Sequence, residues 1–286
     1  MSEIMVLNNP DYSNQRAVPN YEEYFSRWRL KSKDFRQSSP SFLDVPYGNG
    51  WRQTSDIFPQ PLGGKAPVVV FIHGGWWYFL DKRDHSFLVQ PYHEGGCVCV
   101  CVTYPLAPAA TISEIVASVR SSLLWVYRNI ERFGGDPDRI HIAGHSAGGH
   151  LTAMMMATDW SAFNAPTTLV KSGCAVSGLF DLQELVSAPH NANIRMLPEE
   201  ARQNSPVHLI PVAASPLIVS VGRAETAGFV RQHTAFVDAW QSERRPLLDA
   251  SLDGENHFSV IEKFGDSSSE LFEVFWEQIN GAAAGR

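Results

Sequence analysis

The sequence predicts an α/β fold with a mostly parallel β-sheet that is covered by helices on both faces. The first observation is that short, continuously apolar runs rich in β-branched residues recur from residue 67 onward. The second is that helical patterns of apolar residues lie between these runs. Because strands and helices alternate and never separate into two blocks, we expect a single domain over residues 1–286.

An N-terminal arm of about residues 1–40 precedes this regular part. Within the arm, residues 21–36 carry apolar side chains at near-helical spacing, and the segment QSSPS that follows predicts the end of this helix. Two strands joined by a glycine-containing turn are then expected at residues 41–48 and 51–58.

The regular part contains the remaining strands and helices. Strands are expected at residues 67–72, 97–104, 138–144, 169–178, 216–222 and 245–252. Helices are expected at residues 111–135, 147–158, 226–242 and 268–280. The segment 182–212 carries four prolines and interrupts the alternation. We expect it to be an insertion that lies over the site as a partial lid.

Charge and hydropathy argue against several classes of protein. The net charge is −7 at pH 7 and no block of Lys and Arg stands out, which argues against nucleic acid or an anionic membrane as partner. No apolar run approaches the ~20 residues that span a bilayer. The N-terminal segment shows no secretory signal. We therefore expect a cytoplasmic protein that acts on a small molecule, and a homodimer is left open.

Three of the four cysteines alternate in one run, at Cys97, Cys99 and Cys101, and the fourth is Cys174. Alternate residues of a strand share a face, so a metal site is one interpretation of this pattern. However, no His or Asp lies at ligand spacing from the run. We expect a buried strand in which cysteine acts as a small hydrophobic residue, and neither a metal nor a cofactor.

The motif Gly144-His145-Ser146-Ala147-Gly148 has the form G-x-S-x-G. The pattern alone is weak, but here a predicted strand ends at Gly144 and a predicted helix begins at Ala147, which is the context that a nucleophile elbow requires. The glycines let the backbone pass through a strained turn that exposes the serine hydroxyl, and the helix N-terminus favours negative charge there. Ser146 is therefore the candidate nucleophile. The alternative is an incidental serine in a Gly-rich turn.

The general base is expected far downstream, because in this architecture the triad residues follow the order Ser, Asp or Glu, His. His257 fits, since it follows the last predicted strand and a glycine-containing turn and precedes a helix. The nearer histidines His141, His145 and His150 are expected to be packed or hydrogen-bonded. A side chain beside the nucleophile in a sharp turn diverges from it, and His150 should point back toward the sheet or solvent.

An oxyanion hole is expected in the loop after the first long strand, where the sequence HGGWW begins at His73. Glycines there let backbone N–H groups approach a substrate oxygen. We expect the N–H of Gly75 or Trp76, together with that of Ala147, to bind the tetrahedral oxyanion. His73 is expected to shape the loop. The cluster Trp76, Trp77 and Tyr78 has two interpretations, an aromatic wall for a planar substrate or core packing, especially for Trp77.

These segments resemble the α/β-hydrolases of the HGGxW type, the group that includes kynurenine formamidases (arylformamidases) and related carboxylesterases. The resemblance covers nearly the whole chain and implies an eight-stranded sheet and cofactor-independent hydrolysis of an ester or an aryl formamide. One departure is that many relatives carry Asp at the acid position, where this chain has Glu225. The similar segments are 12–28, 73–77, 102–108, 134–151, 177–182, 221–232 and 254–258.

Two residues are candidates for the triad acid. Asp181 and Glu225 each follow a predicted strand, so both are expected at the carboxyl edge of the sheet. Glu225 is favoured because it lies in a tight loop with a helix following and matches the acid position of the resembled family. Asp181 is expected to cap the helix that starts beside it.

The sequence thus predicts a serine hydrolase that cleaves a small carboxylic ester or an N-aryl formamide through an acyl-enzyme, with Ser146, His257 and Glu225 as the triad. The alternative is a non-catalytic protein of the same fold that acts as a receptor or interaction module. The sequence does not distinguish ester from formamide, since both reactions use the same triad.

Overall fold

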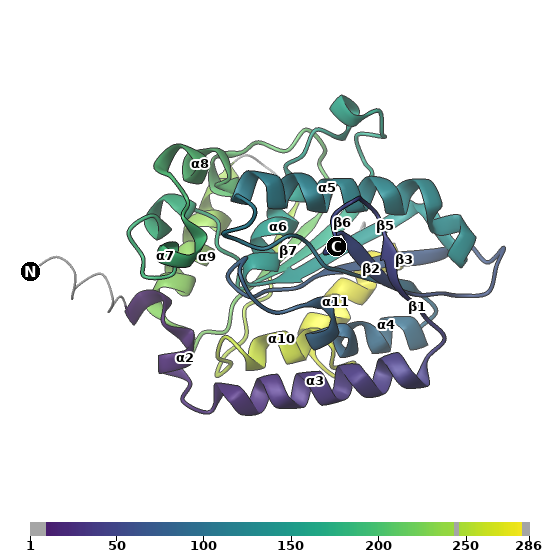
Figure 1. Cartoon of the computed structure of the whole chain (residues 1–286), viewed down its shortest axis with the longest axis horizontal. Helices are drawn as coiled ribbons and strands as arrows, with labels where there is room; N and C mark the ends of the chain where they lie inside the picture. The colour runs from purple at the N-terminus through teal and green to yellow at the C-terminus, as the bar shows by residue number, and fades with distance from the viewer. Residues whose placement is uncertain (1–9, 243–245, 282–286) are drawn as a thin grey trace, which may run out of the picture.

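The computed structural model describes residues 10–242 and 246–281 (Figure 1). Within these ranges it contains one eight-stranded sheet with the strand order β1-β2-β4-β3-β5-β6-β7-β8. Strands β1, β2 and β4 pair antiparallel, and all other neighbours pair parallel. The strands are β1 Phe42–Pro46, β2 Thr54–Phe58, β3 Ala66–Ile72, β4 Val98–Val102, β5 Gly135–His145, β6 Val170–Val176, β7 Leu217–Ser220 and β8 Leu247–Asp249. The predicted mostly parallel, eight-stranded sheet is confirmed.

The helices divide between the two faces of the sheet (Figure 1). Helices α5, α6 and α9 share one hydrophobic cluster with the sheet, and α3, α4, α10 and α11 share a second cluster with it. The α-helices in the described ranges are α2 Asn14–Ala17, α3 Tyr21–Ser38, α4 Gln90–Glu94, α5 Ile112–Asn129, α6 Ala147–Met156, α7 Asn191–Ile194, α8 Pro198–Gln203, α9 Ala227–Ser242, α10 Ser259–Phe264 and α11 Glu270–Ile279. No helix in the described ranges is both long and apolar enough to cross a bilayer.

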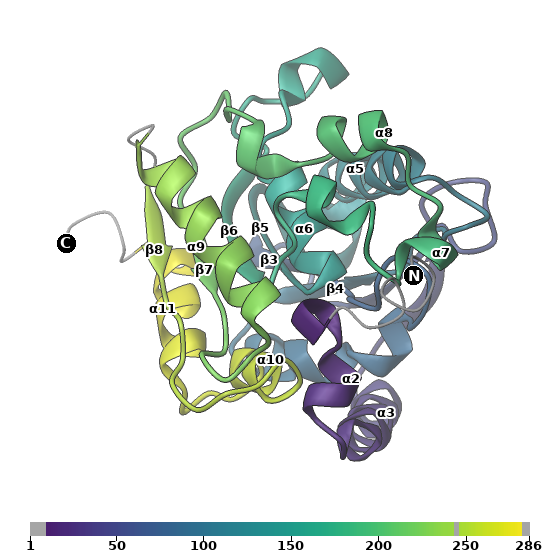
Figure 2. The ribbon, with the colours of Figure 1, turned by 90° about the vertical axis from the view of Figure 1, so that its left-hand side faces the viewer.

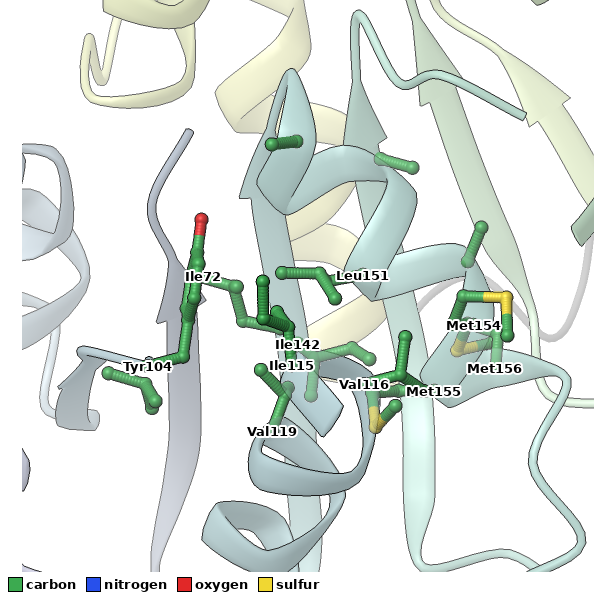
Figure 3. Close-up of a cluster of buried hydrophobic side chains, with 14 of the residues drawn as sticks. Ile72, Tyr104, Ile115, Val116, Val119, Ile142, Leu151, Met154, Met155 and Met156 are labelled. Carbon is green, nitrogen blue, oxygen red and sulfur yellow. The ribbon is translucent and has the colours of Figure 1, made fainter. Parts of the chain in front are cut away.

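Alternate residues of each central strand supply the two clusters. Val68 and Val70 of β3 pack in the cluster under α5 and α6, whereas Val69 and Phe71 pack in the other. Both faces of β3 are therefore apolar because both are covered. Figure 3 shows the first cluster where α5 and α6 meet β3 and β5.

The cysteine run forms β4 and its preceding residue, as predicted. Cys97, Cys99 and Cys101 are fully buried in the second cluster, and so is Cys174 of β6. Burial raises the pKa of the Cys97 thiol to about 12, and it raises the pKa of the other three thiols as well. The run therefore serves as packing.

Several predicted boundaries differ from the structure. The helix expected at 111–135 ends at Asn129, and a 3₁₀ turn with a left-handed Gly134 (φ 84°) leads straight into β5. The last two strands are shorter than expected, and residue 245 of the predicted strand 245–252 lies outside the described residues. The short helices α4, α7 and α8 were not predicted, because segments of four to six residues carry too little periodicity.

The beginning of the described chain, with α2, and the 182–212 segment lie at the end of the molecule that faces the viewer in Figure 2. The hydroxyl of Tyr12 donates to Glu184 at 2.6 Å, and the Nε2 of His190 lies 3.2 Å from the carbonyl oxygen of Tyr12. Residues 1–9 of the predicted arm and the C-terminal 282–286 lie outside the described residues. The single-domain organisation and a lid role for 182–212 stay predictions.

Strand register brings the loops of the site together. Ile72 at the end of β3 lies opposite Gly144 of β5. On the other side of β5, His145 lies opposite Val176 at the end of β6, and an isolated bridge joins Gly222 to Leu252. Because these strands are parallel, the segments that follow them emerge at one edge of the sheet.

Candidate active site

Ser146 lies in a strained turn between β5 and α6. Its backbone has φ 57°, a left-handed value that non-glycine residues rarely adopt. Its N–H donates to the carbonyl of Val176 at 2.8 Å. The two motif glycines are required sterically, since a Cβ on Gly144 would lie 2.3 Å from the carbonyl oxygen of Gly148, and one on Gly148 would lie 2.0 Å from that of Ile72. The structure therefore contains the elbow that the motif predicts.

His257 lies between Ser146 and Glu225. Its Nε2 is 3.1 Å from the Ser146 Oγ, and its Nδ1 is 2.6 Å from the Glu225 Oε2. All three side chains are buried, and the Glu225 side chain is 0% exposed. With the proton on Nδ1, His257 donates to the carboxylate and presents a free lone pair at Nε2 to the serine hydroxyl. The structure thus brings together the three residues that the sequence predicts as a triad.

The second carboxylate oxygen of Glu225 is held by two further donors. The backbone N–H of Gly222 donates to Oε1 at 2.9 Å, and the Oγ of Ser177 donates to it at 2.5 Å. Ser177 directly follows β6, has φ 50° and donates its own N–H to Ser220. The sequence analysis did not single out Ser177. The feature of the sequence that could have identified Ser177 is its position directly after β6, the strand next to the one that leads into the Ser146 turn.

The loop after β3 has an unusual backbone. Gly75, Trp76 and Trp77 have φ values of 108°, 50° and 58°. In the part of the chain that the structure describes, the N–H groups of Gly75 and Trp76 donate to no backbone carbonyl, and neither does that of Ala147 at the start of α6. Gly75 could not carry a side chain, because its Cβ would lie 2.0 Å from the carbonyl oxygen of Phe79. These three N–H groups are therefore not taken up by backbone carbonyls, and Gly75 and Trp76 line the same cavity as Ser146.

His73 supports this loop, as expected. Its ring stacks on Tyr104 with centroids 4.2 Å apart, and its Nδ1 lies 2.6 Å from the carbonyl oxygen of Gly74. The hydroxyl of Tyr104 donates to the His73 carbonyl at 2.8 Å. Burial lowers the pKa of His73 to about 3, so the ring is neutral.

The other histidines near the motif are packed and hydrogen-bonded. The Nδ1 of His141 lies 2.8 Å from the Ser172 Oγ. The Nε2 of His145 lies 2.9 Å from the carbonyl oxygen of His257, and the two rings are 4.6 Å apart. The expected direction of His150 is wrong. It points neither to the sheet nor to solvent, because the Trp77 indole donates to its Nδ1 at 3.2 Å and its Nε2 lies 2.8 Å from the Asn204 carbonyl oxygen.

Asp181 lies apart from this constellation. Its side chain accepts from the backbone N–H of Gln183 at 3.0 Å and caps the 3₁₀ helix Leu182–Leu185, the capping role that the sequence predicts. Its other oxygen lies 4.0 Å from the Nε2 of His208. Of the two candidate acids, the one that contacts His257 is Glu225.

A cavity of about 400 Å³ opens above Ser146. Ser146, His257, Gly75 and Trp76 line it, together with further aromatic residues and two groups from the N-terminal arm and the 182–212 segment. The further aromatic residues are Phe25, Trp28, Phe79 and Phe258. The two groups are Ser13, Asn14, Gln15 and Arg16 from the arm, and Pro189 and His190 from the 182–212 segment.

The cavity corrects two of the expected substrate contacts. Trp77 does not line it, because that indole is fully buried and donates to His150. Tyr78 does not line it either, although its hydroxyl contacts the Nδ1 of His190 at 2.8 Å. The backbone turn sends successive side chains of the cluster in different directions, so only Trp76 faces the cavity.

The sequence analysis missed the contribution of the arm to this wall. Nothing in residues 13–16 signals a binding role, since their placement depends on the contacts that the preceding Asp11 and Tyr12 make with Thr226 and His190. Within the described residues, no three His, Cys, Asp or Glu side chains are grouped so that they could hold a metal ion.

Comparisons with known proteins identify a family and relatives whose names fit a hydrolase site of this geometry. The BD-FAE family model matches residues 56–237. The chain is 31% identical over 251 residues to the kynurenine formamidase of Salmo salar, covering 85% of this chain and 84% of that protein.

Two solved structures share the fold. A protein from a Silicibacter species is 30% identical and superposes with a TM-score of 0.82, covering 92% of this chain and 97% of the other. A Pyrobaculum calidifontis esterase is 16% identical and superposes with a TM-score of 0.70, covering 92% and 94%. The chain belongs to the BD-FAE family and is a kynurenine formamidase- and carboxylesterase-like α/β-hydrolase.

Proposed function

We propose that this hydrolase cleaves a small carboxylic ester or an N-aryl formamide through an acyl-enzyme, with Ser146, His257 and Glu225 as its triad. The observation that carries the proposal is the unbroken chain of contacts from the Ser146 Oγ through His257 to Glu225, at 3.1 and 2.6 Å. Ser146 attacks the carbonyl carbon while the Nε2 of His257 accepts its proton. Glu225 orients the ring and stabilises the imidazolium that forms.

The tetrahedral intermediate carries its charge on the former carbonyl oxygen. We assign its stabilisation to the N–H of Ala147 with that of Gly75 or Trp76, which donate to no backbone carbonyl within the described residues. His257 then gives the proton to the leaving oxygen or nitrogen, and the bond to the leaving group breaks. Water, activated by the same histidine, hydrolyses the acyl-enzyme and restores Ser146.

The cavity supports an aromatic substrate. Five aromatic side chains line it around Ser146, and planar groups pack favourably against such walls. The relative from Salmo salar is named a kynurenine formamidase, which supports a formamide, and the esterase fold of the structural neighbour is equally compatible with an ester. A kcat/KM panel of N-formylkynurenine against short and long p-nitrophenyl esters separates the two.

The competing hypothesis is that the protein is a non-catalytic binding protein of the same fold. The intact constellation argues against it. Labelling with a serine-reactive fluorophosphonate decides the matter, because a catalytic Ser146 forms an adduct in folded protein and loses it in Ser146→Ala. Folded protein that stays unlabelled would favour the binding protein.

The sequence carries one further proposal and leaves one property open. We propose that the protein is cytoplasmic, and a homodimer is left open. Imaging of a tagged full chain tests the first, and light scattering on the purified chain tests the second. A monomer at micromolar concentration would contradict the homodimer.

A further inference from the structure

His190, in the 182–212 segment, joins three parts of the molecule around the cavity. Its ring stacks face to face on the Trp76 indole, with centroids 3.9 Å apart and an angle of 11° between the planes. Its Nδ1 lies 2.8 Å from the Tyr78 hydroxyl, and its Nε2 lies 3.2 Å from the carbonyl oxygen of Tyr12. This one side chain therefore links the 182–212 segment and the N-terminal arm to the loop that follows β3.

The partners of His190 determine which ring nitrogen carries the proton. A carbonyl oxygen can only accept, so the proton lies on Nε2 and is donated to Tyr12. The Nδ1 atom then has a free lone pair and accepts from the Tyr78 hydroxyl. The neutral ring thus uses both nitrogens and one face at the same time. A phenylalanine at this position could keep the stack but neither hydrogen bond.

The loop that follows β3, residues 74–80, carries the N–H groups assigned to the oxyanion and is called the oxyanion loop below. It lies against the nucleophile, since a Cβ on Gly74 would be 3.2 Å from the Cβ of Ser146. Trp76 and Trp77 in this loop have left-handed φ values of 50° and 58°. Non-glycine residues keep such values only where surrounding contacts enforce them. The contacts that hold this loop therefore matter for the oxyanion hole.

Two different parts of the molecule hold the side chains of the oxyanion loop. Trp77 is held by the core, because it is fully buried and its indole donates to His150 at 3.2 Å. Trp76 and Tyr78, on either side of Trp77, are both held by His190. Other rings that pack on Trp76 among the described residues meet it edge-on, so the face of the indole is left to His190.

We propose that His190 is a positioning residue for the oxyanion hole. It docks the 182–212 segment on the oxyanion loop and keeps the N–H groups of Gly75 and Trp76 where the tetrahedral intermediate needs them. This inference rests on the proposed function. His190 acts through the loop and takes no part in proton transfer. Because every ester or formamide forms the same oxyanion, loss of His190 should slow all substrates by a similar factor. A residue that merely lines the cavity would affect some substrates more than others.

The first test is His190→Ala, assayed on p-nitrophenyl acetate and p-nitrophenyl butyrate. We expect kcat to fall about 10-fold on both esters with little change in KM, since a displaced oxyanion donor weakens the transition state and not substrate binding. The affinity for an aryl trifluoromethyl ketone, which adds to Ser146 and forms a tetrahedral oxyanion, should fall by the same factor. A raised KM with unchanged kcat, a loss confined to one ester, or no loss at all would overturn the positioning role.

Two further variants separate the contacts of His190. His190→Phe keeps the stack on Trp76 and should give a kcat between those of the wild type and His190→Ala. Tyr78→Phe removes one hydroxyl and should lower kcat about 3-fold, but it should add nothing in the His190→Phe background, because both changes delete the same hydrogen bond. If His190→Ala does not fold, these variants decide, and wild-type kcat in both would overturn the proposal.

Ser187→Ala is the matched control. It changes an exposed position of the same segment and should leave kcat and KM unaltered. Fluorophosphonate labelling of Ser146 separates the two proposals. A labelled, active wild type whose kcat is unaffected by changes at His190 removes the positioning role alone. An unlabelled and inactive wild type removes the proposed function and the positioning role with it.

Discussion

Ser177 donates its hydroxyl proton to the Oε1 of Glu225 at 2.5 Å, while the Oε2 of the same carboxylate contacts His257. The serine follows β6, and the glutamate follows β7, the next strand in the sheet. Residues that follow two neighbouring strands thus together fix the orientation of the Glu225 carboxylate. Because hydrogen bonds to charged groups are worth more than neutral ones, this contact should matter for catalysis.

Ser177→Ala should lower kcat about 10-fold with little change in KM, since the carboxylate loses a charge-assisted hydrogen bond that fixes the ring of His257. Steady-state kinetics on a p-nitrophenyl ester measures the effect. Ser177→Gly is the matched control, because glycine tolerates φ 50° better than alanine. The glycine variant should be more stable than the alanine variant and equally slow. Recovery of kcat in Ser177→Gly would mean that backbone strain, and not the hydroxyl, caused the loss.

Glu225→Gln should lower kcat by about 10²–10⁴-fold, because the amide keeps the shape but not the charge that stabilises the imidazolium. Asp181→Asn should lower stability slightly and leave kcat near wild type, since Asp181 caps a 3₁₀ helix. Kinetics and thermal unfolding of both variants are compared. The opposite pattern, an inactive folded Asp181→Asn beside an active Glu225→Gln, would make Asp181 the triad acid.

Ser146→Ala and His257→Ala should each abolish measurable turnover while the protein stays folded. The double variant should be scarcely slower than either single one, because the members of a triad act as a unit. Circular dichroism checks the fold and burst-phase kinetics checks the acyl-enzyme. Losses that add in free energy would contradict a shared mechanism.

The fold and the triad could be predicted because they depend on local patterns. The strand that ends at Gly144 and the helix that starts at Ala147 mark the elbow, and the long apolar runs mark the sheet. The cavity wall could not be predicted in the same way. Whether Trp76 or Trp77 faces the substrate depends on left-handed turns at both residues, and the place of Asn14 depends on contacts with residues more than 200 positions away.

Acyl esters should be hydrolysed with decreasing kcat/KM as the acyl chain lengthens from acetyl to decanoyl. Trp76 follows the glycines of the oxyanion loop and lines a cavity of about 400 Å³ that is already bordered by aromatic side chains. Trp76→Ala should widen the tolerated chain length, whereas Trp77→Ala should mainly lower stability, because Trp77 is buried away from the cavity. Activity that rises steadily with chain length in the wild type would be inconsistent with this account.

Stability should fall as the pH drops below about 6.5, before most carboxylates titrate. Burial lowers the pKa of His73 and His141 to about 3 and that of His150 to about 4, whereas an unfolded histidine titrates near 6.5. Between these pKa values the three histidines are therefore protonated in the unfolded chain and neutral in the folded chain. The stability that each neutral histidine contributes is complete above pH 6.5 and is lost as the pH falls toward 3 to 4, with a slope of about 1.4 kcal/mol per pH unit and histidine.

Urea unfolding at pH 7.5, 6 and 5 measures this slope. His141→Gln is the informative variant, because glutamine is polar and close to histidine in size but cannot titrate, whereas the Nδ1 of His141 lies 2.8 Å from the Ser172 Oγ. His141→Gln should reduce the slope of the free energy of unfolding against pH by the contribution of one histidine. Thr234→Ala, a change at an exposed position, is the control and should leave this slope unaltered. If His141→Gln kept the full slope, the ring would have to be protonated in the folded protein at pH 5. That is incompatible with a side chain buried in β5 beside the cations of Arg139 and Lys171, which both disfavour the charged form.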